Sequence, residues 1–122
     1  MTSPTQRTLA WCKEHGLTVQ VVERWCSFSR RRIDLFGCVD LVMAVDCSRA
    51  YPPGERGIYG IQACAGASHA ARRTKSIAEP RLRTWLLAGG RFAVVSWAKR
   101  GERGKRKLWT MRWEEIRLED LP

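Results

Sequence analysis

The stretch that decides the fold is Gly37–Val45, GCVDLVMAV, which is followed after a loop by Tyr59–Cys64, YGIQAC. Each is an almost continuous apolar run with one polar side chain inside it. Short apolar runs without a polar face are typical of central strands that are covered on both sides. The sequence therefore predicts two buried strands, over residues 38–45 and 58–64, at the centre of a sheet.

The polar side chains inside these strands are Asp40 and Gln62. A buried carboxylate costs free energy unless it has a partner or a function. Side chains alternate along a strand, so Asp40 shares a face with Val42, and Gln62 shares one with Gly60. If the strands pair as a hairpin with these faces aligned, Asp40 and Gln62 meet near one end. A carboxylate beside a carbonyl oxygen suits a hard cation, and Mg²⁺ held there could position a phosphate and activate a water.

The rest of the chain predicts one α/β domain over residues 1–122, the size of an ordinary domain. The expected order of elements is αβββαββ, which gives a mixed sheet of four to five strands flanked by helices. Outside the two central strands, we expect helices at 5–15, 67–79 and 80–87, strands at 17–25, 91–99 and 108–113, basic loops at 27–32 and 101–107, and an acidic tail at 114–121.

The charge of the chain indicates a polyanionic partner. It has 22 Lys and Arg against 12 Asp and Glu, a formal net charge of +10. Such an excess repels itself, and binding nucleic acid is the simplest reason to keep it. A solvated surface that aids solubility is the alternative, although mixed signs serve that purpose as well. The basic residues do not form one face of an amphipathic helix, so a membrane partner is not expected.

Three basic clusters are candidates for contacts with DNA phosphates. The first two should flank the mouth of the site, and the third should form a protruding hairpin, so that together they clamp a duplex backbone. No base-reading motif is present, so we expect binding that depends on DNA structure more than on sequence. The residues are Arg30, Arg31 and Arg32; Arg72, Arg73 and Lys75; and Lys99, Arg100, Arg103, Lys105, Arg106 and Lys107.

The two central segments also resemble a known family. GCVDLVMAV, a turn and YGIQAC look like the core of the PD-(D/E)XK nucleases, which place an Asp near the start of one strand and an acid-x-lysine triplet on the next. RRRIDLFG at 30–37 and HAARRTK at 69–75 look like parts of small phage or mobile-element proteins of this group. The resemblance implies a restriction-endonuclease-like core, Mg²⁺ or Mn²⁺ as cofactor, and hydrolysis of double-stranded or branched DNA, as in Holliday-junction resolvases.

Carried over by position, the resemblance makes Asp40 the metal-binding Asp. Gln62 falls at the position of the first acid of the triplet, which is sometimes Gln in the resolvase-like branch. Glu14, on the first helix, could match the extra helix acid of some members. Relatives of the resolvase type are commonly homodimers, which leaves the oligomeric state of this chain open.

One departure from the family pattern concerns the lysine. Cys64 stands at its position, and a thiol cannot supply that positive charge. Arg72 or Lys75, three residues apart on one face of the following helix, could supply it instead. Both could equally be simple phosphate contacts, since a helix beside DNA would be basic in any case.

Other titratable residues near the two strands have structural interpretations. We expect Asp34 to pair with Arg32, Asp46 to cap a turn, and His69 to cap or pack. A nucleophilic pair of Cys64 and His69 is conceivable, but nothing else in the sequence supports acyl transfer.

The cysteines and the aromatic residues give further expectations. Five cysteines without a C-x-x-C pair, a polar N-terminus and the lack of a bilayer-spanning apolar run indicate a cytoplasmic protein. Of the six tryptophans, periodicity places Trp11, Trp85 and Trp97 in the core, and Trp25, Trp109 and Trp113 at edges or interfaces.

Two function classes therefore remain open. The first is a metal-dependent endonuclease. The second is a DNA-binding module with the same fold and a decayed site, which Gln62 and Cys64 would favour. A weaker third class is a structural or regulatory protein of a mobile element that binds another protein.

Overall fold

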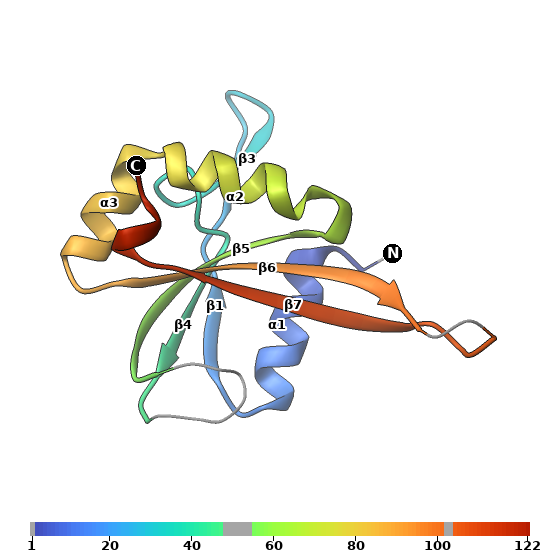
Figure 1. The fold of residues 1–122 in the computed structure, drawn as a ribbon. Coiled ribbons are helices and arrows are strands. Elements are labelled where there is room, and N and C mark those ends of the chain that lie inside the picture. Colours follow the sequence, from blue (N-terminus) through green and yellow to red (C-terminus); the bar gives the residue numbers. More distant parts are fainter. Residues whose placement is uncertain (1, 48–54, 102–103) are drawn as a thin grey trace.

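A five-stranded sheet forms the centre of the fold, with helices on both of its faces (Figure 1). Across the sheet, the strands are β1 (Thr18–Val21), β4 (Leu41–Val45), β5 (Gly57–Ala65), β6 (Arg91–Arg100) and β7 (Leu108–Ile116). The computed structural model describes residues 2–47, 55–101 and 104–122. Within these ranges, β5 and β6 are the one parallel pair of the sheet, and the chain between them crosses over through two helices.

The first helix, α1 (Pro4–Glu14), covers one face of the sheet. Ser3 caps its N-terminus by accepting a hydrogen bond from a backbone N–H of the first turn. Gly16, with φ of +68°, follows the helix and lets the chain turn back towards β1. Trp97 of β6 donates through Nε1 to Thr8 Oγ1 at 2.9 Å, which fixes the helix to the centre of the sheet.

The opposite face is covered by α2 (His69–Ala78) and α3 (Pro80–Leu87), which follow a short turn, η1 (Gly66–Ser68). Pro80 lacks a backbone N–H and disfavours helical geometry at the residue before it, so the helix is divided at Glu79. Glu79 then caps α3 by accepting from the backbone N–H of Arg81. The predicted helix at 80–87 is confirmed to the residue, and the one predicted at 67–79 is confirmed as η1 and α2.

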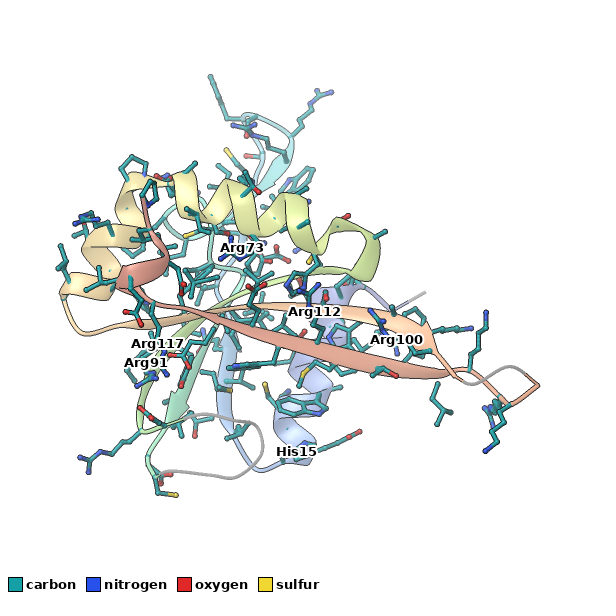
Figure 2. The ribbon with its side chains drawn as sticks, in the orientation of Figure 1. His15, Arg73, Arg91, Arg100, Arg112 and Arg117 are labelled. Carbon is teal, nitrogen blue, oxygen red and sulfur yellow. The ribbon has the colours of Figure 1, made fainter. Side chains whose placement is uncertain are left out.

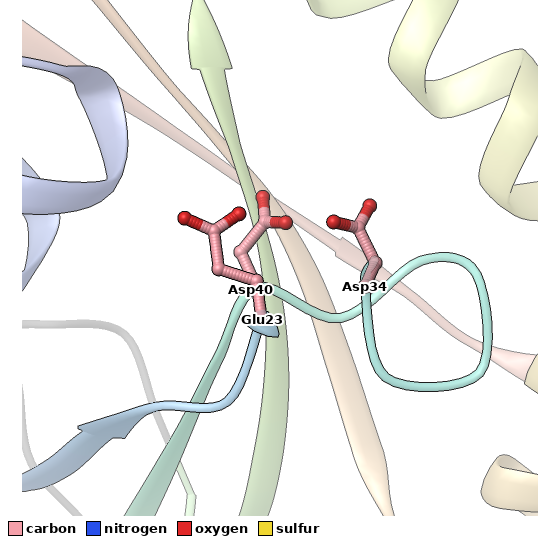
Figure 3. Close-up of side chains that lie close together, drawn as sticks. All are labelled: Glu23, Asp34 and Asp40. Atoms are coloured by element: carbon pink, nitrogen blue, oxygen red, sulfur yellow. The ribbon is translucent and has the colours of Figure 1, made fainter. Parts of the chain in front are cut away.

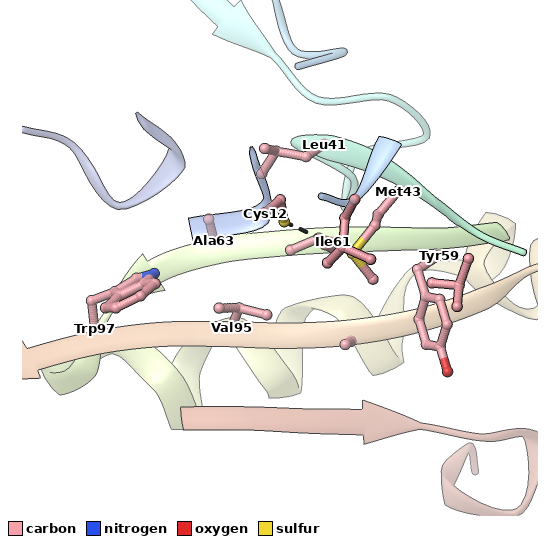
Figure 4. Packing of buried hydrophobic residues seen from close by; sticks show 11 residues of the cluster. Cys12, Leu41, Met43, Tyr59, Ile61, Ala63, Val95 and Trp97 are labelled. Atoms are coloured by element: carbon pink, nitrogen blue, oxygen red, sulfur yellow. Dashed lines mark hydrogen bonds between the residues drawn. The ribbon is translucent and has the colours of Figure 1, made fainter. Parts of the chain in front are cut away.

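Alternation along the strands divides the core into two layers. One layer faces α1 (Figure 4), and the other faces α3, where Leu82 is fully buried. The layer facing α1 contains Leu41, Met43, Val45, Tyr59, Ile61, Ala63, Ala93, Val95 and Trp97. The layer facing α3 contains Cys64, Phe92, Val94 and Ile116, with Val42 packed against them. Asp40 and Gln62 belong to the same side of the sheet as this second layer, because they alternate with Leu41 and Ile61.

The predicted α/β class and mixed sheet are confirmed. The strand expected over 17–25 is divided into two after Val21, and only residues 27–30 of the basic loop expected over 27–32 form a loop. β1 ends at Val21, where the backbone N–H groups of Val22 and Glu23 both donate to the carbonyl oxygen of Asp40, at 2.8 and 3.2 Å. The chain then leaves the sheet and forms a separate antiparallel hairpin of β2 (Arg24–Cys26) and β3 (Arg31–Ile33). Figure 1 shows this hairpin projecting beyond α2.

The C-terminal part of the chain is more ordered than the predicted acidic tail. β7 continues through Glu114 and Glu115 to Ile116, because Ile116 packs into the layer facing α3 and is 1% exposed. A short turn, η2 (Leu118–Asp120), follows. β6 and β7 form a long hairpin that extends away from the rest of the fold (Figure 1). No helix within the described residues is long and apolar enough to cross a membrane.

Candidate functional site

A pocket of about 570 Å³ opens beside the start of β4, between the β2–β3 hairpin and α2. Carboxylates and basic side chains both line it. We call Glu23, Asp34 and Asp40 the acidic cluster. We call Arg31, Arg32, Arg72, Lys75 and Arg81 the basic rim.

Asp40 and Gln62 meet because of the register of β4 and β5. Leu41 pairs with Ile61, and the next position along places Asp40 opposite Gln62, with the Asp40 N–H donating to the Ile61 carbonyl oxygen at 2.8 Å. Gln62 donates through Nε2 to Asp40 Oδ2 at 2.6 Å, and the backbone N–H of Ala63 donates to the same oxygen at 2.9 Å. The hairpin pairing predicted from the alternation is therefore confirmed.

The second polar atom of the Gln62 amide lacks a partner. Gln62 is 2% exposed, and its Oε1 is buried without a hydrogen-bond partner among the described residues. A buried acceptor left in this way costs about 1–3 kcal/mol. Its Nε2 is already used by Asp40, so the carbonyl oxygen is the atom left to accept a hydrogen bond or to ligate a cation. A carbonyl oxygen next to carboxylates is a donor set that Mg²⁺ and Mn²⁺ prefer.

The acidic cluster supplies three carboxylates to the same space (Figure 3). One oxygen from each of Glu23, Asp34 and Asp40 lies within 4.8 Å of the others. Glu23 follows β1 and is held by its backbone hydrogen bond to Asp40, whereas Asp34 follows β3. Three carboxylates at this separation repel one another when all are ionised, and a divalent cation between them would remove that repulsion. The residues present therefore fit a hard cation.

The positions of Asp34 and Glu23 differ from those expected from the sequence. The ion pair expected between Arg32 and Asp34 is absent from the described residues: Arg32 Nη1 lies 3.4 Å from Glu23 Oε1 instead. Asp34 faces Asp40, and Glu23 was not identified as a candidate at all. The sequence offers one signal for Glu23: it lies two residues beyond β1, and β1 pairs with β4, the strand that Asp40 directly precedes.

The pKa of Asp40 is raised to about 8, first by burial, and also by a hydrogen bond to Asp34 and the negative charges of Asp34 and Glu23, while the hydrogen bond from the Ala63 N–H acts in the opposite direction. An acid whose pKa is raised on folding contributes most stability when it is protonated, and loses that contribution as the pH rises through the folded pKa.

The metal-free protein is therefore expected to lose stability between pH 5 and pH 9, by an amount on the order of a few kcal/mol. Asp40→Asn, which cannot ionise, should lack this loss. Urea denaturation of both proteins in EDTA at the two pH values measures the difference. Equal pH dependence of the wild type and the variant would contradict the assigned origin.

Not every predicted site residue reaches the pocket. Glu14 lies exposed at the C-terminal end of α1, whereas the helix meets the pocket through Thr5 in its first turn. Thr5 and Glu14 are nine positions apart along the helix, which corresponds to a rise of about 13 Å. Glu14 is therefore not part of the acidic cluster, and the structure does not bring it to Asp40 and Gln62.

The predicted basic clusters are distributed over three places. Arg31, Arg32, Arg72 and Lys75 join the basic rim as expected, together with Arg81, which the sequence did not single out. The third cluster lies on the β6–β7 hairpin, where Figure 2 shows Arg100 near the end of β6. This cluster contains Lys99, Arg100, Lys105, Arg106 and Lys107, whereas Arg103 lies outside the described residues.

The other two cluster members are not in the pocket lining. Arg30 sits in the loop of the β2–β3 hairpin with a φ of 54°. Arg73 donates through Nε to Glu114 Oε2 at 2.8 Å, so its charge is engaged with β7 (Figure 2).

His69 is a packing residue, one of the two interpretations that the sequence allowed. It is 2% exposed, with Nδ1 2.7 Å from Ser96 Oγ and Nε2 2.8 Å from Glu114 Oε1. Both ring nitrogens are thus used within the fold. Burial raises the pKa of Cys64, which opposes thiolate formation. The structure therefore gives no support to a nucleophilic pair of Cys64 and His69.

Comparison of the chain with protein-family models, with curated proteins and with solved structures gives no match. Evidence for the function thus comes from the site itself: a buried Asp–Gln pair, two further carboxylates, an unpartnered carbonyl oxygen and a rim of positive charge.

Proposed function

We propose that this chain binds DNA and hydrolyses phosphodiester bonds at the pocket, with Mg²⁺ or Mn²⁺ held by the acidic cluster and Gln62. The observation that carries the proposal is the unpartnered Gln62 Oε1 beside three carboxylates, inside a rim of five basic side chains. The acidic side chains would bind the cation, and the basic rim would compensate the negative charge of the DNA phosphates that approach the pocket. The resemblance to PD-(D/E)XK nucleases supports the same assignment, including a restriction-endonuclease-like core.

The proposed chemistry divides between the cation and the chain. When bound, the cation supplies a water of lowered pKa and stabilises negative charge on the phosphate. Asp40, Asp34, Glu23 and Gln62 provide its ligands. The basic rim binds non-bridging phosphate oxygens and orients the phosphorus towards the acidic cluster. Water adds to phosphorus, one P–O ester bond breaks, and the departing sugar oxygen takes up a proton.

Arg72 is the better candidate for the charge that the family lysine would supply. Burial raises the pKa of Cys64, but the positive charge of Arg72 acts in the opposite direction on the same thiol. Arg72 thus acts electrostatically at the position where the lysine is expected. Lys75 lies one turn further along α2 and serves in this proposal as a phosphate contact.

This division predicts different effects for two substitutions. Arg72→Ala should lower the single-turnover rate of cleavage by roughly 100-fold, because it removes charge that stabilises the transition state. Lys75→Ala should mainly weaken binding and reduce the dependence of affinity on salt by about one phosphate contact. Single-turnover kinetics and anisotropy titrations separate the two. Equal effects of both variants on rate and on affinity would contradict the assignment.

A DNA-binding module with a decayed site is the second candidate function. It is favoured by Gln62 and Cys64, which replace an acid and a lysine in the pattern that the chain resembles. The module would keep the basic rim and the salt-sensitive affinity, and would lack hydrolysis.

One experiment distinguishes the two candidates. Supercoiled, linear and four-way-junction DNA are incubated with the wild type and with Asp40→Ala in Mg²⁺ or Mn²⁺, and binding is titrated between low and moderate salt. Cleavage that the variant lacks supports the nuclease. Salt-sensitive binding without cleavage in either metal supports the module. No salt-sensitive binding to any of these DNAs would overturn both.

A further inference from the structure

We propose that the β2–β3 hairpin is an aromatic wedge that stacks on unpaired bases next to the pocket, so that the chain prefers DNA with unpaired bases over continuous duplex. The inference rests on the proposed function, because it concerns which DNA is held at that pocket. It is carried by two aromatic side chains that the site does not otherwise use, Trp25 and Phe28.

The exposure of these two side chains is unusual. Phe28 is 99% exposed in the loop of the hairpin, and Trp25 is 61% exposed on β2. Neither is in ring contact with another described side chain. Trp109, by comparison, lies on the β6–β7 hairpin with Arg7 3.8 Å and Lys99 5.5 Å from its ring centroid. Trp109 is therefore shielded by cations of the chain itself, whereas Trp25 and Phe28 present open faces.

The hairpin is built to hold these rings away from the body of the protein. Its two strands pair over three residue positions, with Trp25 opposite Arg32. The four-residue loop between them, 27–30, ends on Arg30 in a left-handed conformation that side chains seldom adopt. Figure 1 shows the hairpin standing clear of α2.

The charge of the hairpin selects the kind of partner. Residues 24–33, RWCSFSRRRI, contain four arginines and no acid. Nucleic acid offers a polyanionic backbone and flat apolar rings within a few ångströms of each other, which matches a segment that carries both arginine and aromatic side chains. Two aromatic rings would be a weak membrane anchor.

The position of the wedge connects it to the pocket. Trp25 and Arg32 are cross-strand partners and therefore lie on the same face of the hairpin. Arg32 belongs to the basic rim, and Arg31 beside it does as well. A phosphate bound at the rim would thus place its neighbouring base within reach of the ring of Trp25, and the following base near Phe28. In continuous duplex those bases are stacked on one another and their faces are not available.

The test uses binding in EDTA, so that it does not depend on hydrolysis. Affinities are measured for a continuous duplex and for the same duplex with a short central bubble that contains 2-aminopurine, whose fluorescence falls on stacking. The variants are Phe28→Ala and Trp25→Ala. The matched control is Leu87→Ala, which removes a large apolar side chain of similar exposure, 64%, at the end of α3.

We expect the wild type and Leu87→Ala to prefer the bubble and to quench 2-aminopurine. Each wedge variant should reduce the ratio of bubble to duplex affinity by roughly 5- to 100-fold and lose most of the quenching. An unchanged ratio in Phe28→Ala and Trp25→Ala, with DNA binding intact, would overturn the wedge and leave the proposed function standing. A wild type that binds neither DNA would overturn both. Binding to anionic vesicles that depends on Phe28, without bubble preference, would overturn the wedge in favour of a membrane surface.

Discussion

Asp40→Ala is expected to lower the rate of Mg²⁺-dependent DNA cleavage by roughly a thousandfold, about 4 kcal/mol of transition-state stabilisation. Asp40 is the carboxylate that the fold positions most firmly, with three hydrogen bonds of its own backbone and side chain to β5. It also faces both other members of the acidic cluster. Its removal leaves Glu23 and Asp34 without the buried oxygen that joins them to Gln62.

Affinity for DNA should change far less than the rate in this variant, because the basic rim is left in place. Single-turnover cleavage at saturating protein separates rate from affinity. Glu119→Ala is the matched control, since it removes an exposed acid on η2, outside the pocket lining. Cleavage by Asp40→Ala within tenfold of the wild type would contradict the assigned role of Asp40.

His69→Ala should lower the free energy of unfolding by about 3 kcal/mol, a large fraction of the stability of a domain of this size. The substitution opens a cavity at a 2% exposed position and leaves Ser96 Oγ, also buried, without its partner. The substitution also removes one of the two side chains, His69 and Arg73, that hydrogen-bond to the Glu114 carboxylate. His69 is the first residue of α2, so Arg72 and Lys75 would also be less firmly positioned.

Urea denaturation at neutral pH measures this effect. The control is His15→Ala, which replaces the other histidine of the chain at an exposed position after α1, where its ring lies 4.4 Å from that of Trp11. That substitution should cost about 1 kcal/mol or less. A loss below 1 kcal/mol in His69→Ala would show that the buried hydrogen bonds do not stabilise the start of α2.

The sequence was sufficient for the centre of the fold because the information there is local. Two apolar runs, each with one polar residue, predict the β4–β5 hairpin, and the alternation of side chains then brings Asp40 to Gln62. Pro80 and the Gly89–Gly90 pair similarly delimit α3. Each of these predictions depends on residues close together in the chain.

The remaining parts of the site depend on contacts between residues far apart in the chain, which the spacing of apolar residues does not predict. Glu23 reaches Asp40 because the chain leaves the sheet after Val21, and Asp34 reaches it through the β2–β3 hairpin, whose arginine-rich strands lack strand-like composition. The buried environment of His69 includes Glu114, which lies 45 residues further along the chain. Such long-range pairs follow from the packed structure alone.

The most direct test of the central claim is a calorimetric titration of Mn²⁺ into the wild type, Asp40→Ala and the control Glu119→Ala. The account predicts a cation site in the wild type and in Glu119→Ala, and its loss in Asp40→Ala. Equal Mn²⁺ binding by Asp40→Ala, or no binding by the wild type with and without DNA, would contradict the assignment of the acidic cluster as a metal site.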